Sequence, residues 1–599
     1  MKDLSSLSLH LGSLRAGYKS GAFAPAEVIR EVYRRVRILQ SNPIWIHLVP
    51  EEESLRAIEV MRDVADAPLY GVPFAIKDNI DAEGLPTTAA CPSFSYEAES
   101  DATVVARLRR AGAILIGKTN LDQFATGLVG VRSPYGACCN IFNPAYISGG
   151  SSSGSAVAVA AGLVSFALGT DTAGSGRVPA AFNNIVGFKP TRGVLSTRGV
   201  VPACRSLDCV TLFCLTSADA RFLFSIVASY DEQDAYSRHP VTNRTVPSKY
   251  RIGVPSIQIL QNLEPNYRTL FKEAVGRIES LGNSMLEVDV SPFLDSAKLL
   301  YGGPWVAERF AAVGDFIKAC PDATHPVVRE IVLEGEKFSA ADAFKGFHAL
   351  EKYRQASSVT WEAIDLLLLP TAPEIFRIDE IENDPVALNT RLGLFTNFAN
   401  LMDLAAIAVP AGFRGDGLPF GITFFGQAFS ENLLCDCADA YLDSLRPLLG
   451  GTSAVYPGGS MVVEEPASDR FLIAVAGAHL SDEPLNHQLT GRGGRLVRKT
   501  KTAPSYELFA LPGTSPPKPG LVRVGCERGR SIELEVWELP SSEFADFING
   551  VPSPLTIGTV YLSDGRVAKG FLCEEVSVRE ALNISEFGGW KAYLKSLKM

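Results

Sequence analysis

Residues 149–177 decide the fold of the first part of the chain, and they read GGSSSGSAVAVAAGLVSFALGTDTAGSGR. A flexible Gly/Ser linker is the simplest interpretation, but Ala156–Leu168 is apolar and rich in small residues, which predicts a buried, closely packed helix. Ser151–Ser155 would lie at its N-terminus, where backbone N–H groups and the helix dipole favour developing negative charge. A phosphate-binding loop is a second interpretation, but the stretch contains no GKS or GKT, and no GxGxxG motif follows a strand here.

Ser175 is the second glycine-flanked serine of this stretch, in the sequence TAGSG at residues 172–176. Its loop exposes several backbone N–H groups, and such a loop can form an oxyanion hole without side chains. A nucleophilic serine needs a base, but no histidine lies between His47 and His239, so the neighbouring sequence offers no Ser-His-Asp arrangement. A different base is required.

Lys77 is the candidate base, because it follows the apolar run Val72–Ile76. That run would carry the lysine into the core, where loss of hydration lowers the pKa of an ammonium group and frees a neutral amine. The alternative is a structural lysine that extends to solvent or pairs with the adjacent Asp78. The serine stretch favours the catalytic interpretation.

Three motifs together resemble the amidase signature family: Lys77, GGSSSGS at residues 149–155 and GTDTAGSGRVP at residues 169–179. The similarity extends over most of residues 1–445. It implies an amide hydrolase with the amidase-signature fold, an α/β fold in which helices surround a mixed central sheet.

The resemblance also implies a Ser-cisSer-Lys triad, with Ser175 as the nucleophile, Ser151 as the bridging serine and Lys77 as the ultimate base. The two serines are 24 residues apart, which fits the spacing of the family and favours Ser151 over Ser152 or Ser153. The backbone N–H groups implied to form the oxyanion hole are those of Thr172, Ala173, Gly174 and Ser175. This sequence has Ala-Gly where many relatives have Gly-Gly, a departure that backbone donors tolerate.

The segment from Tyr301 to Arg309, YGGPWVAER, is a candidate for substrate binding. Arg309 lies about one helical turn beyond Pro304, a favoured first residue of a helix. A guanidinium group near a pocket offers planar, bidentate donors suited to a carboxylate. The alternative is a surface arginine and a core tyrosine.

The rest of the chain predicts two domains, an amidase-signature domain over residues 1–446 and a smaller β-rich α+β domain over residues 469–599. Between them, residues 447–468 are rich in Gly, Pro and Ser and predict a linker. Helices are expected at Ala102–Ala111 and Arg268–Leu281, and strands at Ala113–Lys118, Met285–Val290, Leu366–Leu369, Phe471–Ala478, Tyr506–Leu511, Thr556–Leu562 and Val567–Cys573. In a further strand, Ile532, Leu534 and Val536 alternate with Glu533, Glu535 and Trp537.

Composition excludes several classes of protein. The net charge of −10 offers no basic surface for nucleic acid or an anionic membrane, so an anionic ligand must meet a local basic group. The eleven cysteines include no CxxC, and the seven histidines form no HExxH, so we expect no bound metal, no cofactor and a reducing cytoplasm. Met1–Leu14 contains no apolar block typical of a secretory signal.

The amidase part together with the C-terminal domain resembles the allophanate hydrolases over nearly the whole chain. This resemblance implies that a small anionic ureide, allophanate (urea-1-carboxylate), loses its terminal nitrogen as ammonia. Tyr301 and Arg309 match positions that hold the substrate in such enzymes, with Arg309 on the carboxylate. A cytoplasmic homodimer and a pathway partner, urea carboxylase, are also expected.

His479 is the candidate catalytic residue of the C-terminal domain, at the end of the expected strand Phe471–Ala478. Hydrolysis of allophanate leaves N-carboxycarbamate, which must lose carbon dioxide, and His479 would promote that step with a nearby Lys or Arg. The alternatives are a half-buried packing histidine and a domain that serves only in assembly.

Two other functions fit the sequence. One is a broad-specificity amidase or carbamate hydrolase with an unrelated accessory domain. The other is an amidotransferase-type subunit that needs a partner. The C-terminal domain weighs against the second, because such subunits typically end with the amidase fold.

Overall fold

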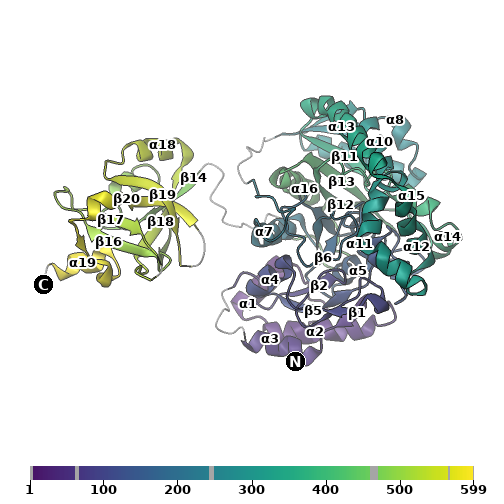
Figure 1. Ribbon diagram of the computed structural model, residues 1–599, viewed down its shortest axis with the longest axis horizontal. Coiled ribbons are helices and arrows are strands. Elements are labelled where there is room, and N and C mark those ends of the chain that lie inside the picture. The colour runs from purple at the N-terminus through teal and green to yellow at the C-terminus, as the bar shows by residue number, and fades with distance from the viewer. Residues whose placement is uncertain are drawn as a thin grey trace. The chain divides into compact units, whose positions relative to one another are not determined.

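The computed structural model describes residues 4–60, 67–241, 249–458, 470–525, 527–563 and 567–597. The chain forms two compact units, residues 1–461 and 462–599, and each is described by itself (Figure 1). The expected linker, residues 447–468, lies outside the described residues from residue 459 onward. Its described part packs within the first unit, because the Asn184 side-chain amide donates to the carbonyl oxygens of Leu448 and Gly450, both at 2.9 Å.

The first unit is built on an eleven-stranded mixed sheet with the order β1-β5-β2-β6-β8-β7-β12-β13-β11-β9-β10. Its strands are β1 (Trp45–Leu48), β2 (Pro73–Lys77), β5 (Ile114–Thr119), β6 (Phe166–Thr170), β7 (Val186–Lys189), β8 (Val210–Cys214), β9 (Arg251–Pro255), β10 (Ser284–Val288), β11 (Leu366–Pro370), β12 (Leu404–Phe413) and β13 (Pro419–Gln427). Strand β2 pairs in parallel with β5 and β6, whereas β8 pairs antiparallel with β6 and β7. The expected α/β fold with a mixed sheet is confirmed.

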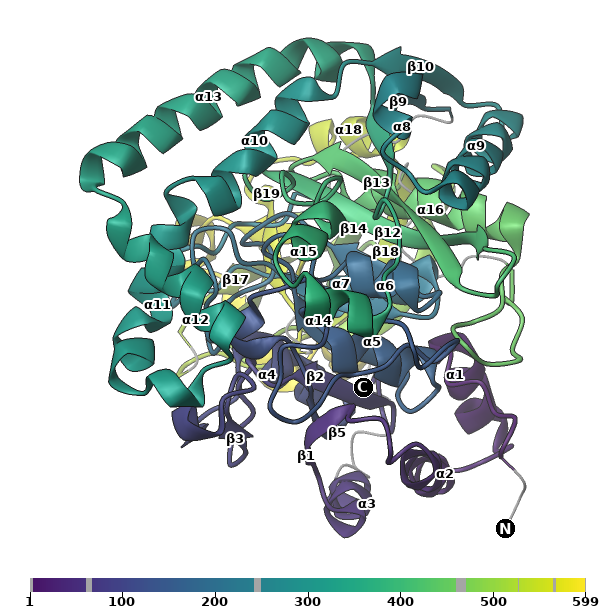
Figure 2. The same cartoon turned by 90° about the vertical axis from the view of Figure 1, so that its right-hand side faces the viewer.

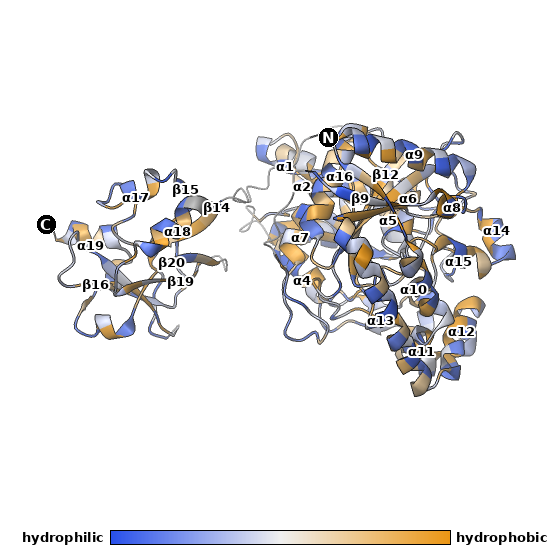
Figure 3. Ribbon diagram, turned by 90° about the horizontal axis from the view of Figure 1, so that it is seen from above, coloured by the Kyte–Doolittle hydropathy of each residue, from blue (hydrophilic) through white to orange (hydrophobic). Residues whose placement is uncertain are grey.

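Helices cover this sheet, and a small hairpin of β3 (Pro86–Thr87) and β4 (Tyr96–Glu97) lies beside it. The helices are α1 (Leu11–Ser20), α2 (Pro25–Ile38), α3 (Glu51–Val60), α4 (Thr103–Arg110), α5 (Ser153–Ala160), α6 (Val178–Phe182), α7 (Ser217–Val227), α8 (Ile257–Leu260), α9 (Pro265–Ser280), α10 (Ser291–Gly302), α11 (Trp305–Ala319), α12 (Pro326–Leu333), α13 (Ala340–Ala363), α14 (Ile378–Asn383), α15 (Ala387–Leu392) and α16 (Glu431–Leu445). Figure 2 shows α10 and α13 side by side. Figure 3 shows apolar and polar residues mixed along outer helices such as α12 and α14, as in helices that lie between a core and water.

The central strands are short apolar runs that are buried on both faces. All five residues of β11 are buried, as are those of β2, β6 and β8. Helix α4 buries Val104, Val105 and Leu108, the face that helical periodicity predicts, and β5 at Ile114–Thr119 follows one residue later than the expected strand Ala113–Lys118. Within the described residues, no helix is long and apolar enough to cross a membrane.

The prediction of a single helix over Ala156–Leu168 is wrong in its second half. Helix α5 ends at Ala160, Gly162 follows with a left-handed φ of +66°, and Phe166 begins strand β6. An apolar run of this kind fits a buried helix or a buried strand equally well, so periodicity alone does not locate the break. The glycine marks it, because only glycine adopts that conformation without strain.

For α9, helical periodicity predicts a buried face of Leu270, Ala274, Ile278 and Leu281, but only Ala274 and Ile278 of these four are buried. Tyr267 and Phe271 lie inside together with Ala274 and Ile278, and Leu270 is only half-buried. The larger aromatic side chains face the sheet, where the Tyr267 hydroxyl donates to the Pro419 carbonyl oxygen at 3.0 Å.

The C-terminal unit contains a five-stranded sheet of order β15-β18-β14-β20-β19 and a three-stranded sheet of order β17-β16-β21. Its elements are β14 (Arg470–Val475), α17 (His487–Thr490), β15 (Arg495–Lys501), β16 (Tyr506–Ala510), β17 (Pro519–Arg523), β18 (Glu533–Pro540), α18 (Ser541–Asn549), β19 (Leu555–Tyr561), β20 (Val567–Cys573), β21 (Leu582–Asn583) and α19 (Trp590–Ser596). Strand β18 does not expose Glu535 and Trp537 as alternation predicts. Both are buried, because the Trp537 indole donates to the Glu535 carboxylate at 3.1 Å and Ser481 covers the same carboxylate.

Candidate active site

Lys77 is the last residue of β2, a strand in the interior of the sheet, and its side chain is fully buried. Its Nζ donates to Ser151 Oγ at 2.8 Å and to Thr170 Oγ1 at 2.7 Å. Thr170 ends the parallel neighbour β6, so the two strand ends deliver these side chains to one point. The contact with Thr170 was not predicted from the sequence.

Burial lowers the pKa of Lys77 to about 7. Three carboxylates, on Asp122, Asp208 and Asp171, act against this shift, and the Arg309 guanidinium reinforces it. A substantial fraction of the lysine is therefore a neutral amine near pH 7, which is the form that accepts a proton.

Of the three consecutive serines, Ser151 is the one in contact with Lys77. The Gly150–Ser151 peptide bond is cis. Ser152 Oγ donates to the Thr170 carbonyl oxygen at 3.1 Å, and Ser153 Oγ donates to the Asn120 carbonyl oxygen at 3.3 Å. The geometry supports the expected choice of Ser151, because the other two hydroxyls hold the backbone around the lysine.

Asp122 fixes the backbone around the cis peptide, and no motif in the sequence indicated it. Its carboxylate accepts the backbone N–H groups of Val129, Gly130 and Arg132 at 3.0–3.1 Å. A Cβ on Gly150 would lie 2.2 Å from Asp122 Oδ2, so only glycine fits there. The buried Asp122 carboxylate thus fixes the shape of the loop that follows it and requires a glycine directly before Ser151.

The loop after β6 is wrapped around Asp171. Arg177 donates to both oxygens of this buried carboxylate, at 2.8 and 3.0 Å, and the N–H groups of Gly174 and Gly176 donate to it at 2.7 and 3.1 Å. Asp171 and Arg177 both lie in the motif that predicted the site, but the ion pair between them was not predicted. The pair gives the loop a fixed shape.

This wrapping changes the expected oxyanion hole, because the N–H of Gly174 is already bound to Asp171. In the described part of the chain, the N–H groups of Thr172, Ala173 and Ser175 have no protein acceptor. Three of the four expected donors are therefore available to an oxyanion.

Ser175 is nearly buried, with 3% of its surface exposed, and its Oγ donates to the Gly127 carbonyl oxygen at 3.5 Å. The preceding residue, Thr126, accepts a hydrogen bond through Oγ1 from Arg309 Nη1 at 3.2 Å. The Thr126–Gly127 pair therefore links the expected nucleophile to the expected carboxylate-binding arginine.

Arg309 lies in the second turn of α11 and is 1% exposed. Its Nη2 donates to the hydroxyl of Tyr301 at 3.3 Å, its Cζ lies 5.1 Å from the centre of that ring, and its Nε has no partner among the described residues. No described carboxylate forms a salt bridge with this guanidinium. A buried cation of this kind is prepared for an anion from outside the chain.

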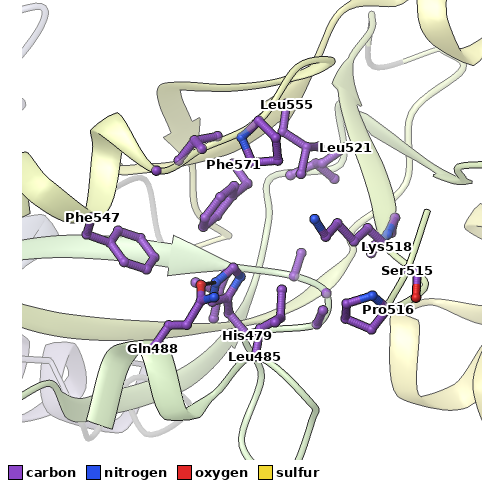
Figure 4. Close-up of a pocket in the computed structure, with 18 of the residues that line it drawn as sticks. His479, Leu485, Gln488, Ser515, Pro516, Lys518, Leu521, Phe547, Leu555 and Phe571 are labelled. Carbon is purple, nitrogen blue, oxygen red and sulfur yellow. Dashed lines mark hydrogen bonds between the residues drawn. The ribbon is translucent and has the colours of Figure 1, made fainter. Parts of the chain in front are cut away.

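His479 lies in a turn after β14 rather than at the end of the strand, which stops at Val475. It lines a cavity of about 260 Å³ in the C-terminal unit together with Lys518, as Figure 4 shows. Its Nε2 is 2.9 Å from Gln488 Oε1, and its ring stacks on Phe571 with centroids 4.9 Å apart. Burial lowers the pKa of His479, so the ring is neutral near pH 7.

Among the described residues, no group of three or more His, Cys, Asp or Glu side chains is arranged so that it could hold a metal ion. The first unit instead combines a glycine-flanked serine, a lysine whose pKa is lowered and whose Nζ contacts a second serine, and backbone N–H donors without a protein acceptor among the described residues. These are the components of nucleophilic catalysis at a carbonyl group.

Comparison with known proteins identifies the class of the chain. The amidase family model matches residues 27–435, and the chain belongs to this family. The model of the allophanate hydrolase C-terminal domain matches residues 471–595. The resemblance found in the sequence motifs is thereby confirmed for both parts.

Three individual proteins show how far along the chain the similarity extends. Urea amidolyase from Saccharomyces cerevisiae is 44% identical over 578 residues, which is 92% of this chain but 31% of that protein, so the chain spans about a third of its length. A solved structure of a serine-to-alanine variant of Kluyveromyces lactis allophanate hydrolase is 40% identical, with a TM-score of 0.74 and coverage of 100% of both chains. A glutamyl-tRNA(Gln) amidotransferase subunit from Symbiobacterium thermophilum is 35% identical over 66% of this chain and 87% of that protein.

Proposed function

We propose that this chain is an allophanate hydrolase, which releases ammonia from the terminal ureide of allophanate through an acyl-enzyme on Ser175. The observation that carries the proposal is the buried guanidinium of Arg309, which forms no salt bridge with any carboxylate that the structure describes and is linked through Thr126–Gly127 to the nucleophile. The likeness to Kluyveromyces lactis allophanate hydrolase over the whole chain supports it.

In the first step, neutral Lys77 accepts the proton of Ser151 while Ser151 takes that of Ser175, and Ser175 Oγ attacks the ureide carbonyl carbon. The N–H groups of Thr172, Ala173 and Ser175 stabilise the oxyanion. The proton then passes to the terminal nitrogen, the C–N bond breaks, and ammonia leaves an acyl-enzyme.

In the second step, water attacks the acyl-enzyme with the same lysine and serine as the base. The product is N-carboxycarbamate, a dicarboxylate. Loss of carbon dioxide with protonation of its nitrogen gives carbamate, which breaks down to the second ammonia and carbon dioxide.

The decisive experiment measures ammonia release by the purified chain from allophanate, biuret, malonamate and simple neutral amides. We expect allophanate to give the highest kcat/KM. Comparable rates on all of them would support the alternative of a broad-specificity amidase or carbamate hydrolase. Activity only after a second protein is added would support the amidotransferase-type role. The likeness to the Symbiobacterium thermophilum amidotransferase subunit is the reason for testing this role.

Arg309→Ala should lose far more activity on allophanate than on a neutral amide of similar size. It removes a charge-assisted contact with the substrate carboxylate, worth about 1.5–3 kcal/mol, or roughly tenfold to a few hundredfold in kcat/KM. The measurement compares the two substrates in one enzyme preparation. Equal losses on both would show that Arg309 is structural.

The C-terminal unit is proposed to promote decarboxylation of N-carboxycarbamate, with His479 and Lys518 facing one cavity. In His479→Ala, and separately in a chain truncated near residue 460, the first ammonia should persist while carbon dioxide release lags. Both products are followed in time in the same reaction. If they appear in the wild-type ratio in both variants, the unit serves in assembly and His479 is a packing residue.

A cytoplasmic homodimer and a pathway link to urea carboxylase complete the proposal. The likeness to urea amidolyases supports the link, since a carboxylated urea is the substrate proposed here. Light scattering of the purified chain tests the dimer.

A further inference from the structure

The loop 203–208 lies beside the oxyanion loop because of strand pairing. It leads into β8, which runs antiparallel to β6 with Thr170 opposite Val210. The oxyanion loop leaves β6 at the same end, and the Asp171 N–H donates to the Cys209 carbonyl oxygen at 2.8 Å. The two loops are therefore neighbours through the sheet itself.

Asp208 ties the two loops together through its side chain. Its buried carboxylate accepts the hydroxyl of Thr172, whose N–H is one of the free oxyanion donors. It also accepts the N–H groups of Ala203 at 2.8 Å and Cys204 at 3.2 Å, so the loop is wound around its own carboxylate. Movement of this loop would move Thr172.

The other side of the loop is tied to the start of α11, the helix that carries Arg309. The N–H and hydroxyl of Ser206 donate to the two carboxylate oxygens of Glu308 at 2.6 and 2.7 Å. The Cys204 thiol contacts the Trp305 carbonyl oxygen at 3.5 Å. Glu308 directly precedes Arg309, so a bidentate contact fixes the loop to the backbone that places the guanidinium.

We propose that loop 203–208 selects substrates by length, because it sets the separation between the oxyanion donors and Arg309. The inference rests on the proposed function, in which the reacting carbonyl lies at the oxyanion donors and the substrate carboxylate lies at Arg309. The positioning residues of this inference are Ser206, Asp208 and Glu308, and none of them touches the substrate. Catalysis requires the reacting carbonyl to lie in the oxyanion hole while the carboxylate is bound, so a shift in either group favours a different chain length.

Substrates of graded length test this separation. Malonamate has one methylene where allophanate has its N–H, succinamate has one methylene more, and oxamate has none. Malonamide has the length of malonamate without its charge. A structural defect lowers the rate on all of them, whereas a change in separation alters their ratio.

Glu308→Ala in the full chain should lower kcat/KM on allophanate and malonamate by roughly tenfold to a hundredfold, since misplacing a bound group by about 1 Å costs on the order of a hundredfold. Malonamide should change by less than about threefold, and the ratio of malonamate to succinamate should fall by about tenfold. Glu308→Gln should restore most of this ratio, because its amide oxygen still accepts from Ser206. Ser206→Ala should reproduce part of the loss.

Asp315→Ala is the matched control, because it removes one carboxylate from an exposed position on the same helix. It should leave every ratio unchanged. If Glu308→Gln behaves like Glu308→Ala, the effect comes from charge near Arg309 and the proposal is wrong. Equal losses on all substrates in Glu308→Ala and Ser206→Ala would also overturn it, because the loop would then be merely structural.

The experiment separates failure of this inference from failure of the proposed function. An inactive wild type on allophanate, or an Arg309→Ala enzyme that loses charged and neutral substrates equally, contradicts the proposed function. An active wild type with the expected Arg309→Ala result and unchanged ratios in the Glu308 variants contradicts the role of the loop alone.

Discussion

Ser175→Ala is expected to abolish ammonia release from allophanate in a protein that remains folded. The substitution removes the oxygen that attacks the carbonyl carbon in the proposed mechanism, so no acyl-enzyme should form, while the free N–H groups of the loop should still bind the carbonyl oxygen. Loss of the nucleophile in a serine hydrolase costs on the order of a millionfold in kcat, and the oxyanion hole alone leaves a small residual rate. The measurement is ammonia release over hours at high enzyme concentration.

The fold is expected to survive because the Ser175 hydroxyl has a weak contact, with the Gly127 carbonyl oxygen at 3.5 Å. Circular dichroism and the thermal midpoint should match the wild type. Ser225→Ala is the control, since it removes a serine hydroxyl at an exposed position of α7 that donates to the Phe222 carbonyl oxygen of the same helix. Substantial activity in a folded Ser175→Ala protein would remove this residue from the mechanism.

The two serines could be selected as candidate site residues from the sequence because they lie in one continuous glycine-rich stretch. Ser151 and Ser175 stand in glycine-rich surroundings where backbone N–H groups are exposed, and that pattern is local. Lys77 could be predicted because an apolar run leads to it and no histidine is available nearby. The contact between Lys77 Nζ and Ser151 Oγ, at 2.8 Å, depends on the packing of α5, which Ser151 precedes, against β2.

The residues that hold the site in shape could not be predicted. Asp122 and Thr126 flank one short turn, Gln123–Ala125, and Asp208 lies in the loop before β8. No local pattern marks any of the three, because their partners are distant in the sequence. The same is true of Gly174, which looked like an oxyanion donor because sequence alone does not show that its N–H is bound to Asp171.

Secondary structure was predictable where the spacing of the apolar residues or the length of the apolar run fits only one kind of element. The apolar face of α4 fits only a helix. The apolar run from Ala156 to Leu168 fits a helix or a strand, and its last residues form part of β6. In β18, alternation failed because Glu535 and Trp537 satisfy each other inside the unit. Buried polar pairs of this kind depend on tertiary partners and leave no periodic signal.

Lys77→Ala and Lys77→Arg should be almost equally inactive, with losses in kcat of roughly ten-thousandfold or more. In the proposed mechanism the lysine acts as a neutral amine, and burial lowers its pKa to about 7, so that this form is available. Arginine keeps its proton throughout the working range, so conserving the charge does not restore a base. An active Lys77→Arg enzyme would show that the lysine serves in an ion pair instead.

The pH profile tests the same base in the wild-type enzyme. In the proposed mechanism the neutral amine is the active form, so kcat/KM should rise about tenfold per pH unit below pH 7 and level off above it. The Arg309 guanidinium holds the pKa of Lys77 down, so its removal favours the ammonium form. In Arg309→Ala, assayed on a neutral amide, the acidic limb should therefore move to higher pH. A limb that stays in place would assign the titration to a group other than Lys77, because this substrate has no carboxylate for Arg309 to bind.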